Sequence, residues 1–411
     1  MSLIPTHRPV IGEDLDALRE QLGLSTMDGC WLYGMSMNKW TKTVKKEARE
    51  VVENASLALL ARELSSNPAL CPVPRMPTAN EILELIKAHQ PSVDKKRLAI
   101  MFGCEASSGY RWITIGSKIS PVLSRLFLVF RTILQASLKR SDSQALSTLA
   151  DWDRMVALEA MQRGVSDVFS SGRWTVKDQS QIQRPILGQD LDELREELGL
   201  STMDACWLYG MSMTKWSKVI NKEGRKPVPN TSLALLVRAL RAHPQACPVP
   251  RMVGANEVFE QVKSVERMAA GGHKPLVIDK KRLAIMFGCE ASSGYRWITI
   301  GSKISPVLAR LFTVFKERHC EALIKARSDA ARGRKNKSFD TADNAMLNEW
   351  DRMVLSEAEV RGIVHIFSIG RWVPYEMLTD KDKAEAAREE GVVRGQAASV
   401  NEQAKDRAEV V

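Results

Sequence analysis

A long stretch of this chain occurs twice without a single difference. The sequence DKKRLAIMFGCEASSGYRWITIGSKISPVL runs from Asp94 to Leu123 and again from Asp279 to Leu308. Packing alone preserves the apolar positions and lets the solvent-facing ones drift. The flanking segments have diverged and carry an insertion. A recent duplication therefore explains the identity less well than an exposed face with the same role in both copies.

The repetition extends over most of the chain. RPVIGEDLDALREQLGLSTMDGCWLYGMSMNKW, from Arg8, returns as RPILGQDLDELREELGLSTMDACWLYGMSMTKW, from Arg184. The segments that begin at Trp152 and Trp350 are also related, and the ten tryptophans form five repeat pairs. We predict a tandem duplication, with halves 1–177 and 184–373, a linker 178–183 and a charged, weakly structured tail 374–411. Each half is expected to own its core and to fold alone.

Apolar residues at helical spacing indicate an all-α fold. Leucines recur in EDLDALREQLGL, and NASLALLARELSS opens with a capping residue before an apolar stripe. The prolines of ALCPVPRM and QACPVPRM require extended backbone, and the basic segment 325–344 is predicted to be a loop or a frayed helix. Each half is predicted to hold two multi-helix modules and a Trp-rich block. The modules are about 15–70 and 94–130, then about 191–246 and 279–316; the blocks are 150–174 and 348–372.

Composition and charge narrow the partners. The 411 residues are 44% apolar and 26% charged, which is ordinary for a globular protein, and their formal net charge of +10 favours a polyanion. We expect a cytoplasmic, nucleoid-associated protein, because no secretory segment begins the chain and Arg131 interrupts its most apolar run. The seven cysteines lack metal-ligand spacing, so buried thiols are expected, with no metal and no cofactor.

Four segments have the spacing of two helices joined by a tight turn. Such a unit needs a small residue midway along the first helix and, four residues later, a glycine that opens the turn. Apolar residues must line the inner faces, as Phe102, Trp112, Tyr33 and Trp40 are placed to do. The small residues and their glycines are Cys30 with Gly34, Ala99 with Gly103, Cys206 with Gly210, and Ala284 with Gly288.

This layout resembles the helix-turn-helix regulators of the Cro/C1 (Xre) family. In that family a turn with Gly, Lys and Pro precedes a leucine-rich helix, as in GRKPVPNTSLALLVRAL and GSKISPVLSRLF. The resemblance covers about two thirds of each half and implies DNA binding. The chain departs from the family at Gly109, where Ile or Val is usual, and at Gly29, a poor helix residue.

The second helix of such a unit lies in the major groove, so its outward residues are candidates for DNA contact. Asn bridges adenine and Arg bridges guanine, whereas lysines mainly hold phosphate. Glu105 argues against DNA at the identical blocks, which are alternatively surfaces for a protein partner or for self-association. The candidates are Ser36, Met37, Asn38, Thr41, Lys42, Lys95, Lys96, Arg97, Ser107, Ser108, Tyr110, Arg111 and Lys118, with Ser212, Met213, Thr214, Ser217, Lys218, Lys280, Lys281, Arg282, Ser292, Ser293, Tyr295, Arg296 and Lys303.

Two functions from different classes remain. The first is a sequence-specific double-stranded DNA-binding protein, a transcriptional regulator of bacterial, plasmid or mobile-element type whose two halves act as an intramolecular pseudo-dimer. The second is a helical adaptor or architectural protein in plasmid replication, partition or transfer, with the identical blocks in protein contacts. An enzyme is disfavoured and no catalytic residue is assigned, because the sequence shows no Walker loop, HExxH or deaminase signature. No membrane partner is expected.

Overall fold

The fold is predominantly helical, as predicted. The computed structural model describes residues 3–165, 167–174, 185–263, 278–331 and 339–384. Within these ranges no strand forms, and two isolated β-bridges occur, Ile11 with Val51 and Leu187 with Pro227. The linker 178–183 and most of the tail 374–411 lie outside the described residues.

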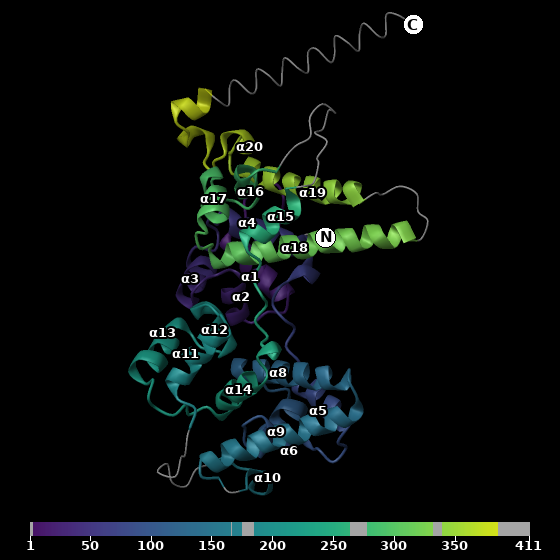
Figure 1. Ribbon diagram of the computed structural model, residues 1–411. Helices are drawn as coiled ribbons and strands as arrows, with labels where there is room; N and C mark the ends of the chain where they lie inside the picture. The colour runs from purple at the N-terminus through teal and green to yellow at the C-terminus, as the bar shows by residue number, and fades with distance from the viewer. Residues whose placement is uncertain (1–2, 166, 175–184, 264–277, 332–338, 385–411) are drawn as a thin grey trace, which may run out of the picture. The chain divides into compact units, whose positions relative to one another are not determined.

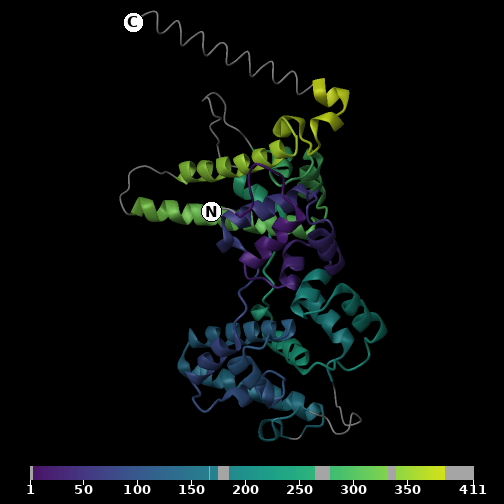
Figure 2. The same cartoon turned by 180° about the vertical axis from the view of Figure 1, so that it is seen from behind.

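The chain divides into two compact units that interleave along the sequence. Unit 1 is Met1–Pro72 with Arg251–Val411, and unit 2 is Val73–Pro250. Figures 1 and 2 show the purple N-terminal helices beside the green helices of unit 1, and the blue helices beside the teal helices of unit 2. The units therefore divide the chain differently from the sequence halves 1–177 and 184–373. Each unit takes one segment from each half, which differs from our expectation that each half owns its core.

In the part of the chain that the structure describes, unit 1 combines four α-helices from the start of the chain with six from the segment after Arg251. The first group is α1 (Gly12–Gln21), α2 (Thr26–Leu32), α3 (Met37–Thr41) and α4 (Ala55–Ser66). The second is α15 (Ala255–Val262), α16 (Lys280–Met286), α17 (Ala291–Tyr295), α18 (Pro306–Ala331), α19 (Phe339–Val360) and α20 (Ile366–Ile369). The segment 325–344 is thus helical through Ala331 and again from Phe339, and the residues between them lie outside the described chain.

Unit 2 contains the equivalent helices in one continuous segment. They are α5 (Ala79–Lys87), α6 (Lys95–Met101), α7 (Ala106–Tyr110), α8 (Pro121–Leu138), α9 (Asp142–Gln162), α10 (Val168–Ser171), α11 (Gly188–Glu197), α12 (Thr202–Leu208), α13 (Met213–Ser217) and α14 (Thr231–Ala242). The boundaries of the two units fall in the two CPVPRM segments, which are non-helical, as their prolines predict.

Aromatic side chains form the centre of each unit. Phe102 and Trp152 pack around Phe130 of α8, with ring centroids 5.1 and 4.7 Å from the Phe130 centroid. The Trp152 indole N–H donates to the Met101 carbonyl (3.0 Å), and Trp350 makes the same bond to Met286 (2.9 Å). The tryptophan blocks are therefore structural. By length and composition α8 is apolar enough to cross a membrane, and most of it is buried inside the protein.

In each unit, the part from the first sequence half meets the part from the second half where a helix N-terminus approaches a turn glycine. Gly103 has φ +75°, and a Cβ on it would lie 2.7 Å from the Ser232 backbone nitrogen at the start of α14. The Ser232 hydroxyl donates to the Phe102 carbonyl (2.7 Å). In unit 1, Gly288 and Ser56 take these places, and the Ser56 hydroxyl donates to the Phe287 carbonyl (2.6 Å). These glycines both open a turn and admit the neighbouring helix.

Candidate nucleic-acid interface

Helices α2 and α3 form a compact pair whose interior follows the predicted pattern. Gly34 adopts φ +62° in the turn, and Cys30, on the inner side of α2, is buried. The Tyr33 and Trp40 rings stack with centroids 5.6 Å apart. The Ser36 hydroxyl caps α3 by accepting from the Lys39 backbone N–H (3.3 Å). This framework fixes which side chains of α3 face outward.

The outward side chains at the start of α3 include most of the predicted contacts. Ser36, Asn38, Thr41 and Lys42 are exposed. Met37 is half-buried because its sulfur lies 3.8 Å from the Cys30 sulfur, so only part of it is presented outward. An exposed Asn in the first turn of a helix has the reach to bridge an adenine edge.

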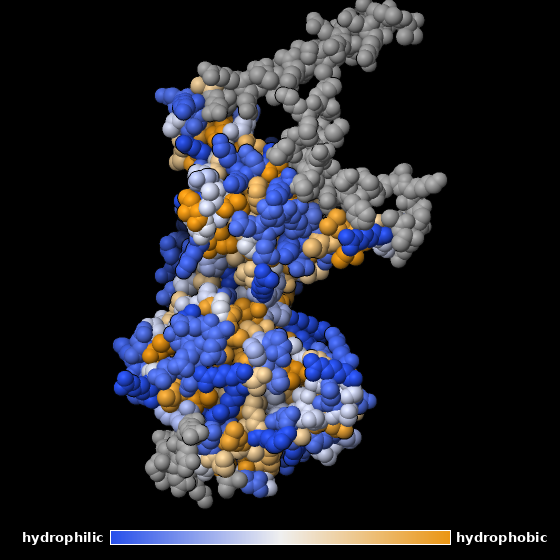
Figure 3. Space-filling model, in the orientation of Figure 1, coloured by the Kyte–Doolittle hydropathy of each residue, from blue (hydrophilic) through white to orange (hydrophobic). Residues whose placement is uncertain are grey.

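The pair α12–α13 presents the same face in unit 2. Ser212, Met213, Thr214, Ser217 and Lys218 are all exposed. The surface over α13 is mostly hydrophilic in Figure 3. The chemical difference between the two faces lies mainly at Thr214, which replaces Asn38, so the two helices are suited to related but different contacts.

A π-helical turn follows α3, and no pattern in the sequence predicts it. The turn covers Lys42–Lys46, and its equivalent after α13 covers Lys218–Lys222. Gly12 makes room for it, because a Cβ on Gly12 would lie 2.1 Å from the Thr43 carbonyl oxygen. The wider turn directs the chain out of α3 with its lysines toward solvent.

Several cations on and after α3 and α13 were not among the residues predicted from the sequence to contact DNA. Lys39, Lys45, Lys46 and Arg49 are exposed, and within the described chain none of these four forms an ion pair. Lys42 pairs with Glu47 at 2.6 Å. The signal was present in NKWTKTVKKEAR and TKWSKVINKEGRK, where a cation follows the inward tryptophan every few residues. In unit 2, Lys215, Lys222 and Arg225 correspond to Lys39, Lys46 and Arg49 and are exposed. Asn221 stands in place of Lys45, and the exposed Lys226 stands in place of Glu50.

Helices α6 and α7 cross more closely than α2 and α3 do. A Cβ on Gly109 would lie 1.7 Å from the Lys95 carbonyl oxygen, and Gly294 has the same relation to Lys280. The glycine that departs from the Cro/C1 pattern is therefore required by this crossing. Ala99 and Phe102 are buried, as predicted, and Leu98 is buried beside them. Trp112, also predicted to face inward, is partly buried and packs edge-on against Phe127.

The residues predicted to contact DNA on the pairs α6–α7 and α16–α17 do not share one exposed face. Lys96, Ser107, Tyr110, Arg111 and Lys118 are exposed, as are their equivalents Lys281, Ser292, Tyr295, Arg296 and Lys303. Ser108 and Ser293 are only 7% and 6% exposed. They accept hydrogen bonds from Arg111 (3.0 Å) and Arg296 (2.9 Å), so they lie inside the fold and are not carried into the proposal below.

Several predicted phosphate ligands already have protein partners. Arg97 donates to Asp153 at 2.6 Å and lies over the Phe169 ring, and burial raises the pKa of Asp153. Arg282 donates to Asp351 in the same way. The Lys95 ammonium donates to the Thr114 hydroxyl (2.9 Å), and Lys280 donates to Thr299 (2.9 Å). These side chains stabilise their units.

Glu105 has a structural role that sequence reasoning did not find. Its carboxylate accepts from the Trp174 backbone N–H (3.0 Å), and Glu290 accepts from Trp372 (3.3 Å). Each carboxylate thereby ties the start of α7 or α17 to the segment after α10 or α20. These hydrogen bonds explain why Glu105 and Glu290 are acidic without a contact to cytosine.

The identical blocks 94–123 and 279–308 expose apolar side chains as well as polar ones. Tyr110 and Ile115 are 55% and 64% exposed, and Tyr295 and Ile300 are 54% and 65% exposed. All four lie on or after the second helix of their pair. This face is more apolar than that of α3 and has fewer cations.

Comparison of the chain with models of protein families, with curated proteins and with solved structures finds no match. The resemblance to the Cro/C1 family thus stays a prediction from the residues that carry it. The geometry of α3 and α13 and the charge around them carry the functional argument.

Proposed function

We propose that the protein is a sequence-specific double-stranded DNA-binding regulator of bacterial, plasmid or mobile-element type. In this proposal the chain is a tandem duplication in which α2–α3 and α12–α13 are helix-turn-helix units. Helices α3 and α13 enter the major groove of two related half-sites, so one chain acts as a pseudo-dimer. It is not an enzyme, and it works in the cytoplasm at the nucleoid.

The observation that carries this proposal is the outer face of α3 together with the turn behind it. A capped first turn presents Asn38 to solvent, and the exposed cations Lys39, Lys45 and Lys46 follow without carboxylate partners in the described chain. Polar groups at a helix start suit base edges, and flanking lysines suit phosphate. At α13 the capped first turn presents Thr214 in place of Asn38, and the exposed cations Lys215 and Lys222 accompany it.

The salt dependence of binding tests the role of the lysines. We expect affinity for a duplex selected from a random library to fall steeply with salt, because each neutralised phosphate contributes a slope of about −0.9 in log K against log [salt]. Lys45→Ala with Lys46→Ala should make the slope shallower by up to about 2. Lys139→Ala removes an exposed charge at the end of α8 and should leave the slope of log K against log [salt] unchanged. A flat salt dependence in the wild-type protein would refute the proposal.

A second candidate function concerns the identical blocks. The exposed Tyr110 and Ile115, with Arg97 bound to Asp153, favour α7 and α17 as surfaces for a protein partner in an adaptor or architectural role. The variant Tyr110→Ser with Tyr295→Ser should then keep full DNA affinity. A tenfold or greater loss of DNA affinity would instead assign these helices to DNA.

A further inference from the structure

The two units share several of the contacts that join their segments, so these contacts do not decide which segments pair. In unit 1, Arg62 of α4 forms a buried ion pair with Glu357 of α19. In unit 2, the corresponding pair is Arg238 of α14 with Glu159 of α9. The turns that the two helices approach belong to blocks of identical sequence. Helix α4 would therefore find these partners in the first half of the chain as well as in the second.

A further ion pair in unit 1 is not repeated at the corresponding positions of unit 2. The Arg318 guanidinium of α18 donates to the Glu63 carboxylate of α4 (2.5 Å) and to the Glu349 carboxylate of α19 (2.6 Å). Glu63 is 1% exposed. Burial raises the pKa of Glu63, although Arg318 and Asn67 favour its charged form. Glu63 is thus a buried acid that receives its counter-ion from α18.

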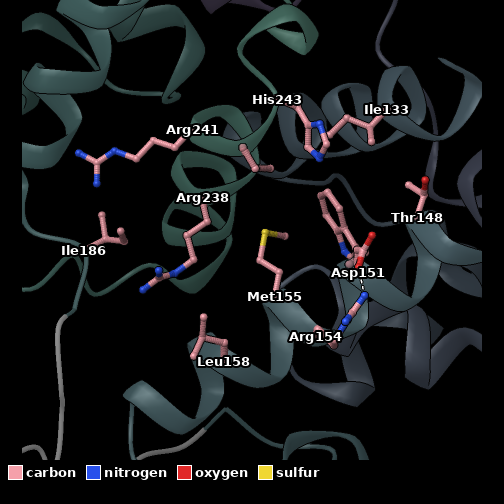
Figure 4. Close-up of a pocket in the computed structure, with 13 residues that line it drawn as sticks. Ile133, Thr148, Asp151, Arg154, Met155, Leu158, Ile186, Arg238, Arg241 and His243 are labelled. Atoms are coloured by element: carbon pink, nitrogen blue, oxygen red, sulfur yellow. Dashed lines mark hydrogen bonds and ion pairs between the residues drawn. The ribbon is translucent and has the colours of Figure 1, made fainter. Parts of the chain in front are cut away.

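The same two positions are apolar in unit 2. Ile133 of α8 stands where α18 has its arginine, and Ala239 of α14 stands where α4 has its glutamate. Both residues line an opening of about 570 Å³ between α9 and α14, and Figure 4 shows the Ile133 side chain at its edge. The cation of α9 that lines this opening, Arg154, already pairs with Asp151. This surface therefore suits an alanine on the helix that packs against it, and a buried carboxylate has no counter-ion there.

Packing of α4 on the wrong segment would leave a buried charge uncompensated. In the full chain α4 packs on α18 and α19, and α14 packs on α8 and α9. If α4 took the place of α14, Glu63 would face Ile133 and lose its guanidinium partner. Removal of one partner from a buried ion pair is strongly destabilising, because the other charge stays buried. This penalty falls on the exchanged arrangement and not on the observed one.

We propose that Glu63 and Arg318 select the partner of α4. Their contact joins residues 1–72 to the segment after Arg251, and it disfavours packing of α4 on α8 and α9 of the first half. The contacts that both units share stabilise either arrangement, whereas this pair discriminates between them. Since α2–α3 and α4 belong to one segment, the same choice places α2–α3 in unit 1. This inference does not depend on the proposed DNA binding.

A cysteine at position 56 reports which block α4 has joined in the full chain. The Ser56 hydroxyl lies 3.5 Å from the Cys289 sulfur, and the Ser232 hydroxyl lies 3.5 Å from the Cys104 sulfur. Ser56→Cys should therefore form a disulfide with Cys289 when the protein is oxidised with copper phenanthroline. Packing of α4 on the first half would join it to Cys104 instead. The tryptic peptides around these two cysteines are identical, so Cys104→Ser and Cys289→Ser versions of each variant identify the partner.

Moving either charge to the other unit should move this disulfide. Ile133→Arg with Arg318→Ile carries the cation to α8, and Glu63→Ala with Ala239→Glu carries the anion to α14. In each exchange the two charges meet only if α4 and α14 trade places. The ratio of the first-half to the second-half disulfide should then rise at least about tenfold. The variant with all four substitutions should restore the original disulfide, because its charges meet again in the observed arrangement.

A matched control and the folding of the variants make the result decisive. Thr132→Glu with Glu317→Thr carries a charge between the same two helices at exposed positions, and its disulfide should stay at Cys289. A Cys104 disulfide in either exchange supports the proposal, whether non-reducing electrophoresis finds it within one chain or between two copies. A Cys289 disulfide in both exchanges, each unfolding cooperatively, would overturn it. Failure of both exchanges to fold beside a folded four-residue variant would also overturn it, since the pair would then stabilise unit 1 without selecting a segment.

Discussion

Glycine residues set how closely the helices of each two-helix pair approach. At Gly294 a Cβ would lie 1.7 Å from the Lys280 carbonyl oxygen, a separation that no side-chain rotation relieves because the backbone fixes the positions of both atoms. Gly254 offers the opposite case, since nothing lies within 4 Å of its Cβ position and its φ is −85°. Both glycines belong to unit 1, which makes them a matched pair.

Gly294→Ala should therefore destabilise the protein more than Gly254→Ala does. We expect Gly294→Ala to cost about 1–3 kcal/mol in the free energy of unfolding, the usual range for overpacking. Gly254→Ala should cost less, no more than about 1 kcal/mol, because its Cβ meets open space and the only loss is that of a glycine at the N-cap of α15. Equilibrium unfolding in urea, followed by far-UV circular dichroism, measures both changes. Equal free energies in the two variants would contradict the packing at Gly294.

The thiols on the inner side of α2 and α12 should be chemically inert. Burial raises the pKa of Cys30 and Cys206 to about 12. These thiols stay protonated at pH 8, and only the thiolate reacts. The unfolded chain ionises them above about pH 8.5, so the free energy of unfolding should fall as the pH rises from about 9 to 12 and should not change from this cause below that range.

Iodoacetamide labelling at pH 8, read by mass spectrometry, tests this expectation. Cys30 and Cys206 should react slowly in the folded protein and fully in guanidinium chloride. Rapid labelling of both residues in the folded protein would show that they are not buried.

At the scale of elements, sequence reasoning predicted the helices, the turn glycines and the inward Tyr33 and Trp40. It did not predict the π-helical turn after α3, because that turn depends on a tertiary contact in which Gly12 leaves room for the Thr43 carbonyl. It also did not predict the partner of α4. The turns that the starts of α4 and α14 approach, at Gly288 and Gly103, belong to blocks of identical sequence, so the pattern at this contact favours neither pairing.

The start of α4 supplies a test of how the segments of unit 1 are joined. Ser56→Ala removes the hydroxyl that donates to the Phe287 carbonyl and leaves a buried acceptor without that bond, which should cost about 1–3 kcal/mol. Ser66→Ala, at the exposed end of the same helix, should change the stability by no more than about 0.5 kcal/mol. Urea unfolding of both variants measures the difference; similar values would mean that this contact does not hold α4 in place.

For the whole molecule, the interleaved units change which fragment should fold alone. Residues 73–250 form a continuous segment that contains all of unit 2. Residues 1–177 contain α4 without α18 and α19, on which it packs in the full chain. The sequence repeat alone pointed to 1–177, because it shows which segments are related and not which ones pack together.

We therefore expect the fragment 73–250 to be monomeric and to unfold cooperatively. The fragment 1–177 should expose the apolar face of α4 and should associate or unfold non-cooperatively. Light scattering and thermal unfolding of the two fragments compare them. A monomeric, cooperatively unfolding 1–177 beside an unfolded 73–250 would contradict the division into units.

We propose that α3 and α13 read two related DNA half-sites, and the exchange of Asn38 for Thr214 between the two helices allows a direct test. Duplexes should be selected from a random library by the wild-type protein and by Asn38→Thr, which gives α3 the residue of α13, and then sequenced. The wild-type protein should enrich two half-sites that differ in part, and Asn38→Thr should make one half-site resemble the other, because each base contact contributes about 1–3 kcal/mol of discrimination. The absence of any enriched sequence, or a paired sequence that Asn38→Thr leaves unchanged, would contradict the claim.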